Sequence, residues 1–390
     1  MEGLLNTLLL LAVAVNLASV AYLLVAIRRV GLFQMRSRPS RAARPPVTIL
    51  KPVCGLDPGL YGNLRSFCAQ DYPKFQVIFG VRDPADPAVP IIRRVIEEFP
   101  LVDATLVIDG SVAGPNLKVS NLANMYRSAK HAHIVIADSD MRVDPNYLSS
   151  VIAPFEDERV GVVTCLYAGT AVGGIASRLA SMFINEWFLP SVLVSVGLSE
   201  LRFAFGATIA VRRELLERIG GFRRLSNVLA DDHMLGKLVS ARGFKVALSN
   251  YIVENVVYER DLAAMLRHEL RWARTVRTVE PLGHAFSFLM YGIPLALFGA
   301  AMIDATIDWG ALELAIIAVP ILLRLWMHFT VCKKLGVPSG GGSIWLVPVR
   351  DVLSFLVWAA SFFGRDIDWK GRHFTVRPDG LMTAAKGSDA

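Results

Sequence analysis

The stretch Ile134-Val135-Ile136-Ala137-Asp138-Ser139-Asp140 decides the expected fold. An apolar run of strand-forming residues stops at two carboxylates, and a short continuous apolar run is typical of a buried parallel strand. Ligands of open α/β sheets bind beyond the carboxyl ends of the strands, so Asp138 and Asp140 are expected to project into a crevice. Such close carboxylates repel each other without a cation, and Mg²⁺ commonly binds one or two carboxylates together with phosphate oxygens. The pattern predicts a metal–diphosphate site, with a solvated turn as the simpler alternative.

The composition indicates a membrane protein with one globular domain of ordinary size. The 390 residues are 53% hydrophobic, with a mean hydropathy of +0.44. An uncharged apolar run from about Leu4 to Ile27 is long enough to cross a bilayer. Six arginines and no acidic residue lie between Arg28 and Arg44. Because the positive charge follows the apolar run, we expect a retained anchor with its N-terminus outside, rather than a signal peptide or a nucleic-acid-binding tail.

The cysteines suggest a reducing compartment. The four residues Cys54, Cys68, Cys165 and Cys332 are scattered without a Cys-x-x-Cys pair. This spacing predicts neither a zinc site nor a disulfide framework, which fits a domain in the cytosol.

Short apolar runs alternate with helical stretches after the anchor, which predicts a mostly parallel α/β sheet. The expected strands are Val47–Lys51, Phe75–Val81, Thr105–Ile108, Ile134–Ala137 and Gly161–Cys165. The expected helices lie around Leu60–Ala69, Val89–Phe99 and Leu117–Ala129. No Gly-x-Gly-x-x-Gly follows the first strand and the chain has no P-loop motif, which argues against a nicotinamide dehydrogenase and a P-loop ATPase.

The middle of the chain combines apolar and globular segments. Ile175–Leu198 is apolar but interrupted by polar residues, so we expect it at the membrane surface, with a packed core helix as the alternative. Phe203–Arg212 has a strand-like pattern. Asp231 is expected to cap the helix that begins there, and Asp261 to cap the next one.

Three later segments are candidates to enter the membrane: Phe286–Ile303, Leu312–Val331 and Ile344–Phe363. Arg324 is expected near the inner end of the second, where its side chain can extend to the interface. The lysines Lys333 and Lys334 before Gly340–Gly342 place that turn in the cytosol. The basic tail Arg365–Arg377 favours the cytosol as well, whereas three full crossings would put it outside. A re-entrant or interfacial segment would reconcile the two.

Several polar groups are expected on one side of the sheet. They are Asp83 and Asp86, the run Asn116–Asn121 with Lys118, Asp138 and Asp140, Asp231 and Asp232, and the pair Arg271 and Trp272. A sugar-nucleotide transferase needs a carboxylate or amide that reads the base and a metal that neutralises the diphosphate. It also needs a general base for the attacking hydroxyl and an arginine for the departing phosphates.

These motifs resemble those of the ceramide glucosyltransferase family, membrane enzymes with a GT-A catalytic domain. The likeness runs from Leu50-Lys51-Pro52 to Trp369-Lys370-Gly371-Arg372. It implies a Rossmann-like, mostly parallel sheet with transmembrane helices, and Mg²⁺ or Mn²⁺ as cofactor. The segment from Phe205-Gly206-Ala207-Thr208 to Gly220-Gly221-Phe222 looks like the one that shapes the donor-sugar and acceptor pocket.

The resemblance also assigns roles to single residues. Asp86, in Asp86-Pro87-Ala88, would help to hold the nucleotide, and Asp83 and Lys118 are expected beside the donor. Asp138 and Asp140 would serve the diphosphate and the metal, and Asp232 would be the catalytic base.

One motif departs from the family pattern. The closing motif is usually Gln or Arg, two free positions, then Arg-Trp, and here its first position is His268. Arg271 and Trp272 match and are expected at the departing UDP. A solvated helix face is the alternative for His268.

Hydropathy and charge, together with the resemblance, divide the chain into an anchor (1–28), a basic linker (29–45), a cytosolic GT-A domain (46–284), transmembrane or interfacial helices (285–364) and a basic tail (365–390). It implies an inverting glycosyltransferase that uses a UDP-sugar donor and a membrane lipid acceptor.

Asn116-Leu117-Lys118-Val119-Ser120-Asn121 and His268-Glu269-Leu270-Arg271-Trp272 prompt comparison with the bacterial hopanoid branch of the family. That branch is taken to transfer N-acetylglucosamine to bacteriohopanetetrol, which would place the protein in a bacterial inner membrane. A ceramide glucosyltransferase using UDP-glucose is the alternative. A processive polysaccharide synthase needs more membrane spans and usually a Gln before Arg-Trp, and a non-catalytic scaffold would not need the aspartates.

Overall fold

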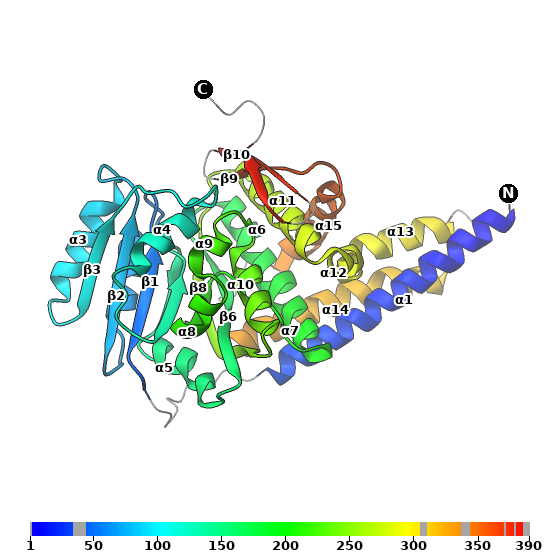
Figure 1. The fold of residues 1–390 in the computed structure, drawn as a ribbon. Helices are drawn as coiled ribbons and strands as arrows, with labels where there is room; N and C mark the ends of the chain where they lie inside the picture. The colour runs from blue at the N-terminus through cyan, green and yellow to red at the C-terminus, as the bar shows by residue number, and fades with distance from the viewer. Residues whose placement is uncertain are drawn as a thin grey trace. The chain divides into compact units, whose positions relative to one another are not determined.

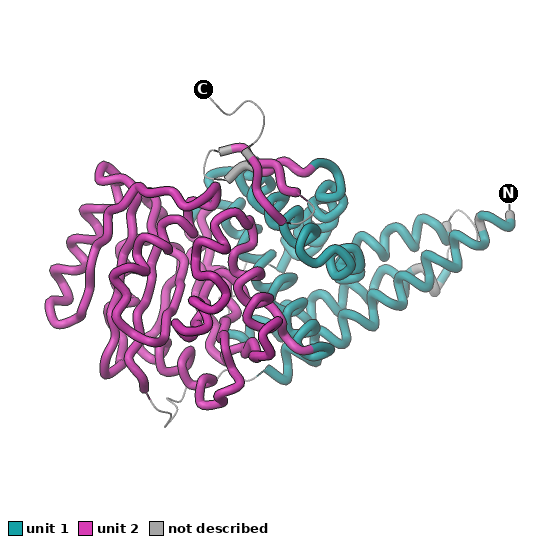
Figure 2. The backbone as a smooth tube through the Cα atoms, viewed as in Figure 1, with its two compact units in different colours: residues 1–34, 173–199, 259–364 teal, residues 35–172, 200–258, 365–390 magenta. Residues whose placement is uncertain are grey.

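The computed structural model describes residues 2–33, 44–304, 310–336, 344–369, 372–377 and 380–384. Most of the expected basic linker and the Gly340–Gly342 turn lie outside these residues. The chain forms two compact units (Figure 2). Unit 1 contains residues 1–34, 173–199 and 259–364, and unit 2 contains residues 35–172, 200–258 and 365–390.

Unit 2 is built on an eight-stranded mixed sheet (Figure 1) with the strand order β3-β2-β1-β4-β7-β6-β8-β5. The strands are β1 (Val47–Pro52), β2 (Phe75–Val81), β3 (Asp103–Ile108), β4 (His133–Ala137), β5 (Met141–Arg142), β6 (Val160–Ala171), β7 (Thr208–Arg212) and β8 (Lys245–Val257). Strands β3, β2, β1 and β4 are parallel, β7 is antiparallel to both β4 and β6, and β6 is parallel to β8. The carboxyl ends of β4, β6 and β8 therefore lie at one edge of the sheet.

Helices cover both faces of this sheet (Figure 1). They are α2 (Leu60–Cys68), α3 (Ala88–Glu98), α4 (Leu117–Tyr126), α5 (Tyr147–Ile152) with the 3₁₀ turn η1 (Ala153–Glu156), α8 (Arg213–Arg218), α9 (Gly221–Leu225) and α10 (Asp231–Ser240). In β4, Ile134 and Ile136 pack in one core cluster while Val135 and Ala137 pack in the other. A strand buried on both faces has to be apolar at every position, which is the pattern from which this strand was predicted.

The expected strands are found, most of them with small changes at their ends. The predicted Gly161–Cys165 strand is part of the longer β6, whereas only Thr208–Arg212 of Phe203–Arg212 is a strand. Strand β8 was not predicted from the sequence, although it runs for 13 residues beside β6.

The expected basic tail contains structure of its own. Strands β9 (Asp366–Trp369), β10 (Arg372–Val376) and β11 (Met382–Ala384) form a three-stranded antiparallel sheet in unit 2. The amide of Leu229 donates to Gly380 O at 3.2 Å, and that of Met382 donates to Asn227 O at 2.9 Å. Leu229 also packs in an apolar cluster with Ile367. The end of the chain is thus attached to the segment that precedes α10.

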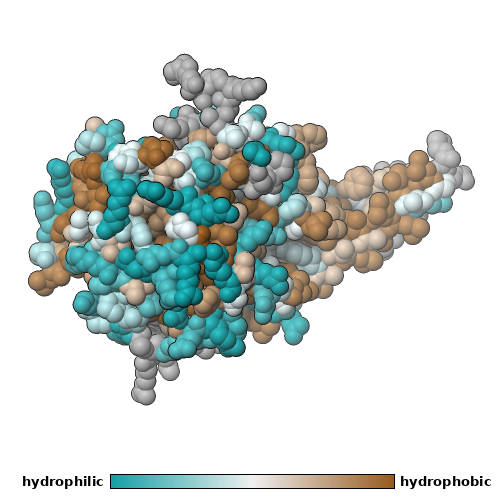
Figure 3. Space-filling view, viewed as in Figure 1, coloured by the Kyte–Doolittle hydropathy of each residue, from teal (hydrophilic) through white to brown (hydrophobic). Residues whose placement is uncertain are grey.

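Unit 1 is helical. It contains α1 (Glu2–Leu32), α6 (Ile175–Phe183), the π-helical turn η2 (Ile184–Phe188), α7 (Leu189–Leu198), α11 (Leu262–Val279), α12 (Pro281–Phe286), η3 (Ser287–Met290), α13 (Gly292–Asp304), α14 (Ala311–Leu335), η4 (Ile344–Leu346) and α15 (Val347–Ser361). Helices α1, α13 and α14 lie side by side (Figure 1). Hydrophobic residues predominate on the visible face of these helices (Figure 3). Leu10 and Leu17 of α1 are among the exposed large hydrophobic residues.

Within the described residues, four helices are long and apolar enough to cross a membrane. They are Asn6–Leu32, Ile175–Leu198, Leu314–Leu335 and Ile344–Ser361, and the pair Pro281–Met290 and Gly292–Ile303, bent by 68°, would add a fifth. Ile175–Leu198 is mostly buried inside the structure. This burial favours the packed helix over the membrane-surface helix that we expected first.

The fold of unit 2 restricts how the chain can cross a membrane. A globular α/β unit lies on one side of a bilayer, and its sheets contain residues from before, between and after the two helical segments 173–199 and 259–364. Each helical segment therefore returns to the side that it left and crosses an even number of times. The tail lies on the same side as the sheet, which agrees with its charge and excludes three full crossings between residues 259 and 364.

The expectation that Arg324 extends to the interface is wrong. Its side chain is 1% exposed and lies inside unit 1, with Nε 3.3 Å from Asp351 Oδ1 and the guanidinium 4.1 Å from the ring centre of Trp187. Glu186 Oε2 lies 3.7 Å from Arg324 Nη2, and Glu186 Oε1 forms a hydrogen bond of 2.8 Å with His328 Nδ1. Buried charges need partners, and in unit 1 the partners are acids on two other helical segments.

A tight backbone contact holds α10 in unit 2 and generates the first prediction. A Cβ at Gly236 would lie 2.5 Å from Ala204 N and 2.6 Å from Phe203 Cα. Gly236→Ala should therefore lower the free energy of unfolding by about 1–3 kcal/mol, the usual range for overpacking. The matched control is Gly62→Ala in α2, where the nearest atoms are the Arg142 guanidinium at 3.6 Å or more.

In Gly62→Ala, the helical preference of alanine should raise stability by roughly 0.5–1 kcal/mol. Unfolding of the purified full-length protein in detergent, followed by near-UV circular dichroism, measures both effects. Equal stability of Gly236→Ala and wild type would contradict the proposed contact.

Candidate active site

A buried lysine shapes the turn that follows β4. Lys51, on β1, donates to the carbonyl oxygen of Asp138 and, at 3.3 Å, to that of Met141. Its ammonium lies 3.6 Å from the ring centre of Phe67, and the side chain is fully buried. Hydrogen bonds from the Lys51 side chain therefore hold the backbone of the Asp138–Asp140 turn, which is not a free solvated loop.

A second lysine neutralises the first carboxylate of the turn. Lys118 Nζ lies 2.6 Å from Asp138 Oδ1. Lys118 belongs to the first turn of α4, which Asn116 caps by accepting from the amide of Val119 at 3.0 Å. The amide group of Asn116 also donates to Asp231 Oδ1 at 3.2 Å and to Val228 O at 2.9 Å. The N-terminus of α4 thus connects the end of β4 with the start of α10.

Gly206 lies close to both Asp138 and Asp232. A Cβ at Gly206 would lie 3.0 Å from Asp232 Oδ2 and 3.8 Å from Asp138 Oδ2. Gly206 lies in the loop before β7, where the Phe205 amide donates to Thr164 Oγ1 at 2.8 Å. The expected pocket-shaping segment therefore does meet the two carboxylates, and a side chain at Gly206 would crowd them.

The second carboxylate of the turn has further partners. Asp140 Oδ2 accepts from Asn255 Nδ2 at 3.0 Å, and the Asp140 carbonyl accepts from the Val256 amide at 2.9 Å. Asp57 accepts from Ser139 Oγ at 3.1 Å, which adds a third acid beside the turn. Neither Asp57 nor Asn255 was predicted from the sequence, because one lies in a loop and the other in β8, and neither belongs to a recognisable motif.

Burial and charge shift the pKa values of this cluster. Burial, with a contribution from Asp231, raises the pKa of Asp232 to about 7, and Lys118 opposes the shift. Burial and the nearby carboxylates Asp138 and Asp57 raise the pKa of Asp140 to about 6. Asp232 is thus divided between its two forms near neutral pH, as a general base requires.

The two lysines shift in opposite directions. Burial lowers the pKa of Lys51 to about 7, against the attraction of Asp140 and Asp138. Burial also disfavours the charge of Lys118, but Asp138 and Asp231 outweigh it, so that the pKa of Lys118 is raised.

The expected helix cap at Asp231 is wrong, while that at Asp261 is confirmed. Helix α10 begins at Asp231 itself, after Ala230, and no side-chain hydrogen bond caps it. The Asp231 carboxylate accepts from Asn116 instead. Asp261 Oδ1 accepts from the Ala264 amide at 2.7 Å and caps α11. Asp231 therefore links the start of α10 to Asn116.

Asp86 and Asp83 hold the backbone of loops. Both Asp86 oxygens accept from the Gly55 amide, at 3.1 and 3.0 Å, and one accepts from the Ala88 amide at 2.9 Å. Asp86 thereby joins the loops after β1 and β2. Asp83 is exposed and accepts from the Ala85 amide at 2.8 Å. Their roles at the nucleotide stay predictions.

Arg271 and Trp272 lie on α11, which belongs to unit 1, so their approach to the aspartates stays a prediction. Trp272 contacts the His268 ring, with the ring centres 4.4 Å apart. His268 Nδ1 shares a hydrogen bond of 2.7 Å with Glu259. His268 thus contacts an acid and an aromatic ring while its side chain is 38% exposed, so the alternative of a solvated helix face still stands beside a role at the site.

The acids at β4 fit a divalent ion that a diphosphate would help to bind. Among the described residues, no group of three His, Cys, Asp or Glu is arranged to hold a metal. Asp138 and Asp140 provide the one or two carboxylates that Mg²⁺ takes when phosphate oxygens complete its shell. The unfavourable crowding of Asp140 with Asp138 and Asp57 is what a cation there would relieve.

Comparison with known proteins identifies the relatives of this chain. The family profile described as glycosyl transferase family 21 matches residues 10–382. Ceramide glucosyltransferase 3 of Caenorhabditis elegans is 26% identical in an alignment of length 251, and the match covers 62% of this chain and 54% of that protein. Ceramide glucosyltransferase of Candida albicans is 37% identical in an alignment of length 118, and the match covers 27% of this chain and 22% of that protein. The chain thus spans at most about half the length of these relatives.

A solved structure supports the fold. A mannosyltransferase from Pyrobaculum calidifontis, in complex with GDP-Man and Mn²⁺, matches 90% of this chain and 99% of its own, with a TM-score of 0.57 and 21% identity. Together with the family match, this similarity confirms the expected α/β class with a GT-A-like sheet.

The pKa shift of Asp232 is directly measurable. Carbodiimide reacts with protonated carboxyl groups, so labelling of Asp232, read by peptide mass spectrometry, should fall as the pH rises through about 7. The midpoint should move to lower pH in Asp231→Asn, which removes a neighbouring negative charge. It should move to higher pH in Lys118→Gln, which removes a positive one.

Asp157 is the internal control, because its pairing with Arg159 lowers its pKa to about 2. Its labelling should fall at far lower pH in all three proteins. Shifts of the same sign in the two variants would contradict the assigned electrostatics.

Proposed function

Because the chain belongs to glycosyl transferase family 21, we propose that it is an inverting glycosyltransferase that transfers a sugar from a UDP-sugar to a hydroxyl group of a membrane lipid. The observation that carries the proposal is the meeting of Asp138 and Asp232 at Gly206. One carboxylate belongs to the turn that suits a diphosphate, and the other has the raised pKa of a general base. The carboxylate for the donor diphosphate and the carboxylate for the acceptor proton thus both lie close to Gly206.

The donor side consists of the turn after β4 and the start of α4. Lys118, 2.6 Å from Asp138, offers a positive charge to the donor diphosphate. Asp138 and Asp140 would hold Mg²⁺ or Mn²⁺, which when bound supplies the charge that stabilises a leaving diphosphate. Lys51 keeps the turn in position by donating to its backbone carbonyls.

On the acceptor side, Asp232 takes the proton from the lipid hydroxyl. The acceptor oxygen forms a bond to the anomeric carbon while the bond from that carbon to the diphosphate oxygen breaks. UDP leaves with the electron pair, and a single displacement of this kind inverts the anomeric centre. Arg271 and Trp272 would assist at the departing UDP, Arg271 through the fork of donors that suits phosphate.

The course of the chain supports a lipid acceptor. Strands β6 and β8 are parallel and paired as far as Ala171 and Val257. The chain leaves unit 2 for the helical unit just after these two residues. This is also the edge at which Asp138 and Asp140 follow β4, and Val256 is hydrogen-bonded to Asp140. The donor turn therefore lies at the edge of the sheet where both apolar excursions begin.

The resemblance to the hopanoid branch favours N-acetylglucosamine as the sugar and bacteriohopanetetrol as the acceptor, in a bacterial inner membrane. The names of the relatives favour a second candidate, the transfer of glucose to ceramide. Both reactions use the same groups and differ only in the pockets for sugar and lipid.

The test is to identify the product. Membranes containing the protein are incubated with UDP-N-acetylglucosamine or UDP-glucose and either lipid, and the lipid extract is analysed by mass spectrometry. We expect a singly glycosylated lipid. Asp232→Asn should reduce its formation by about 10²–10⁴-fold, the usual effect of removing a general base, with UDP-sugar affinity retained.

Asp231→Asn is the matched control and should keep turnover within an order of magnitude, because an amide can still accept from Asn116. If Asp231→Asn is inactive and Asp232→Asn is not, the roles are reversed. A polymeric product would indicate a processive synthase, and no turnover with any donor would contradict the proposed function.

The metal role leads to a separate prediction. Asp140→Asn should weaken both Mn²⁺ binding in the presence of UDP and turnover, because an amide does not supply the carboxylate charge. Asp144→Asn, four residues further along and exposed, is the control and should change neither. Electron paramagnetic resonance of free Mn²⁺ measures binding independently of activity. Full turnover in excess chelator would exclude the metal.

A further inference from the structure

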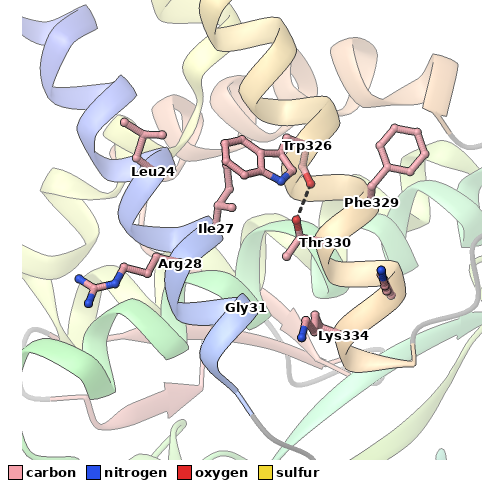
Figure 4. A pocket seen from close by; sticks show the side chains of 9 residues that line it. Leu24, Ile27, Arg28, Gly31, Trp326, Phe329, Thr330 and Lys334 are labelled. Carbon is pink, nitrogen blue, oxygen red and sulfur yellow. Dashed lines mark hydrogen bonds between the residues drawn. The ribbon is translucent and has the colours of Figure 1, made fainter.

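A groove lies between α1 and α14 within unit 1 (Figure 4). Its volume is about 510 Å³. It is lined by Leu24, Ile27, Arg28 and Gly31 of α1 and by Trp326, Phe329, Thr330, Lys333 and Lys334 of α14. Both helices are candidate membrane spans, and the lining residues belong to the C-terminal part of each. The groove is therefore at one end of two adjacent spans and outside the aspartate cluster.

The wall of the groove is apolar. Ile27 is buried at its base, whereas Leu24, Trp326 and Phe329 remain 46%, 55% and 59% exposed. Thr330 cannot make the wall polar, because its hydroxyl donates back to Trp326 O at 2.8 Å (Figure 4). Large exposed side chains at the end of a membrane span are suited to contact with lipid chains, and tryptophan is enriched at this depth.

The rim of the groove is cationic. Arg28, Lys333 and Lys334 are exposed. In the described part of the chain, no acid forms an ion pair with these three side chains. In Figure 4, Arg28 extends outward from the α1 edge and Lys334 stands below the apolar wall on α14. The groove thus combines an apolar wall with a cationic rim. Water does not complement the apolar wall, and a lipid without net charge does not balance the three positive charges.

We propose that this groove binds one anionic phospholipid of the surrounding membrane. Its phosphate lies among Arg28, Lys333 and Lys334, and the upper part of an acyl chain lies against Trp326 and Phe329. Basic pockets between transmembrane helices on the cytoplasmic side bind such headgroups. A zwitterionic lipid carries a positively charged ammonium group that these cations repel, and free phosphate has no group for the apolar wall. The bound lipid differs from the acceptor, since no hydroxyl or general base is needed.

The experiment uses the purified full-length protein in neutral detergent. Phosphatidylglycerol with brominated acyl chains is titrated in, and tryptophan fluorescence is recorded. Bromine quenches only nearby indoles, so the signal of Trp326, one of seven tryptophans, is isolated by subtracting the titration of Trp326→Phe. We expect saturable quenching by this lipid, and little quenching by brominated phosphatidylcholine at the same mole fraction.

The triple variant Arg28→Gln, Lys333→Gln, Lys334→Gln should bind the anionic lipid on the order of 100-fold more weakly, at about fivefold for each basic residue near the membrane surface. The control triple variant Lys74→Gln, Arg93→Gln, Lys245→Gln removes the same charge from exposed positions in unit 2. It should bind within twofold of wild type. Thermal unfolding of each variant shows whether the helical bundle is intact.

Three outcomes would overturn the proposal. These are equal quenching by the two brominated lipids, unchanged affinity of a folded Arg28/Lys333/Lys334 triple variant, and displacement of the lipid by millimolar inorganic phosphate. The last outcome would indicate a simple anion site. Loss of sugar transfer in any variant does not enter the test, so its result is independent of the proposed function.

Discussion

Two lysines, the buried Lys51 and the half-buried Lys118, hold together carboxylates that would otherwise repel one another. Lys118 forms an ion pair with Asp138 and contributes attraction to Asp231 and Asp232, while Lys51 binds the backbone beneath Asp138. Their opposite pKa shifts distinguish their tasks. Lys118 is surrounded by acids and is stabilised as a cation, so it can face an anionic donor. Burial dominates for Lys51, which suits a residue that organises the backbone from inside.

The surrounding elements are arranged so that these charges can meet. Asn116 caps α4 and also binds Asp231, so the helix that presents Lys118 is fixed to the helix that presents Asp232. Gly206 leaves the space beside Asp138 and Asp232 free of a side chain. Gly236 allows α10 to approach the backbone at Phe203 and Ala204, in the same loop. The site therefore depends on close backbone contacts as much as on its acids.

The local sequence pattern predicts the structure correctly where the pattern of apolar residues matches the pattern of burial. The stretch through Asp140 is buried on both faces up to the point where its side chains become acidic, so a simple apolar run predicted both the strand and the turn. The local pattern fails where the partner is distant in sequence. The apolar segment around Arg324 gives no sign that Asp351 and Glu186 lie beside this arginine in the folded chain. Aspartate at a helix start is typical of an N-cap, yet the hydrogen-bond partner of Asp231 is Asn116, 115 residues earlier in the chain. Strand β8 was missed because polar Ser249 and Asn250 interrupt its apolar alternation.

The same distant pairings explain how an α/β domain can be combined with a membrane without losing its sheet. The chain departs twice from one edge, after β6 and after β8, and the parallel pairing of these strands keeps the two departure points adjacent. Each excursion returns to the sheet, first through β7 and finally through the small sheet that binds Asn227 and Leu229. Because Asp231 and Asp232 follow directly after those residues, the final return supports the segment that leads into the proposed base. If the helical excursions enter a membrane, each therefore has to cross it an even number of times for the site to assemble.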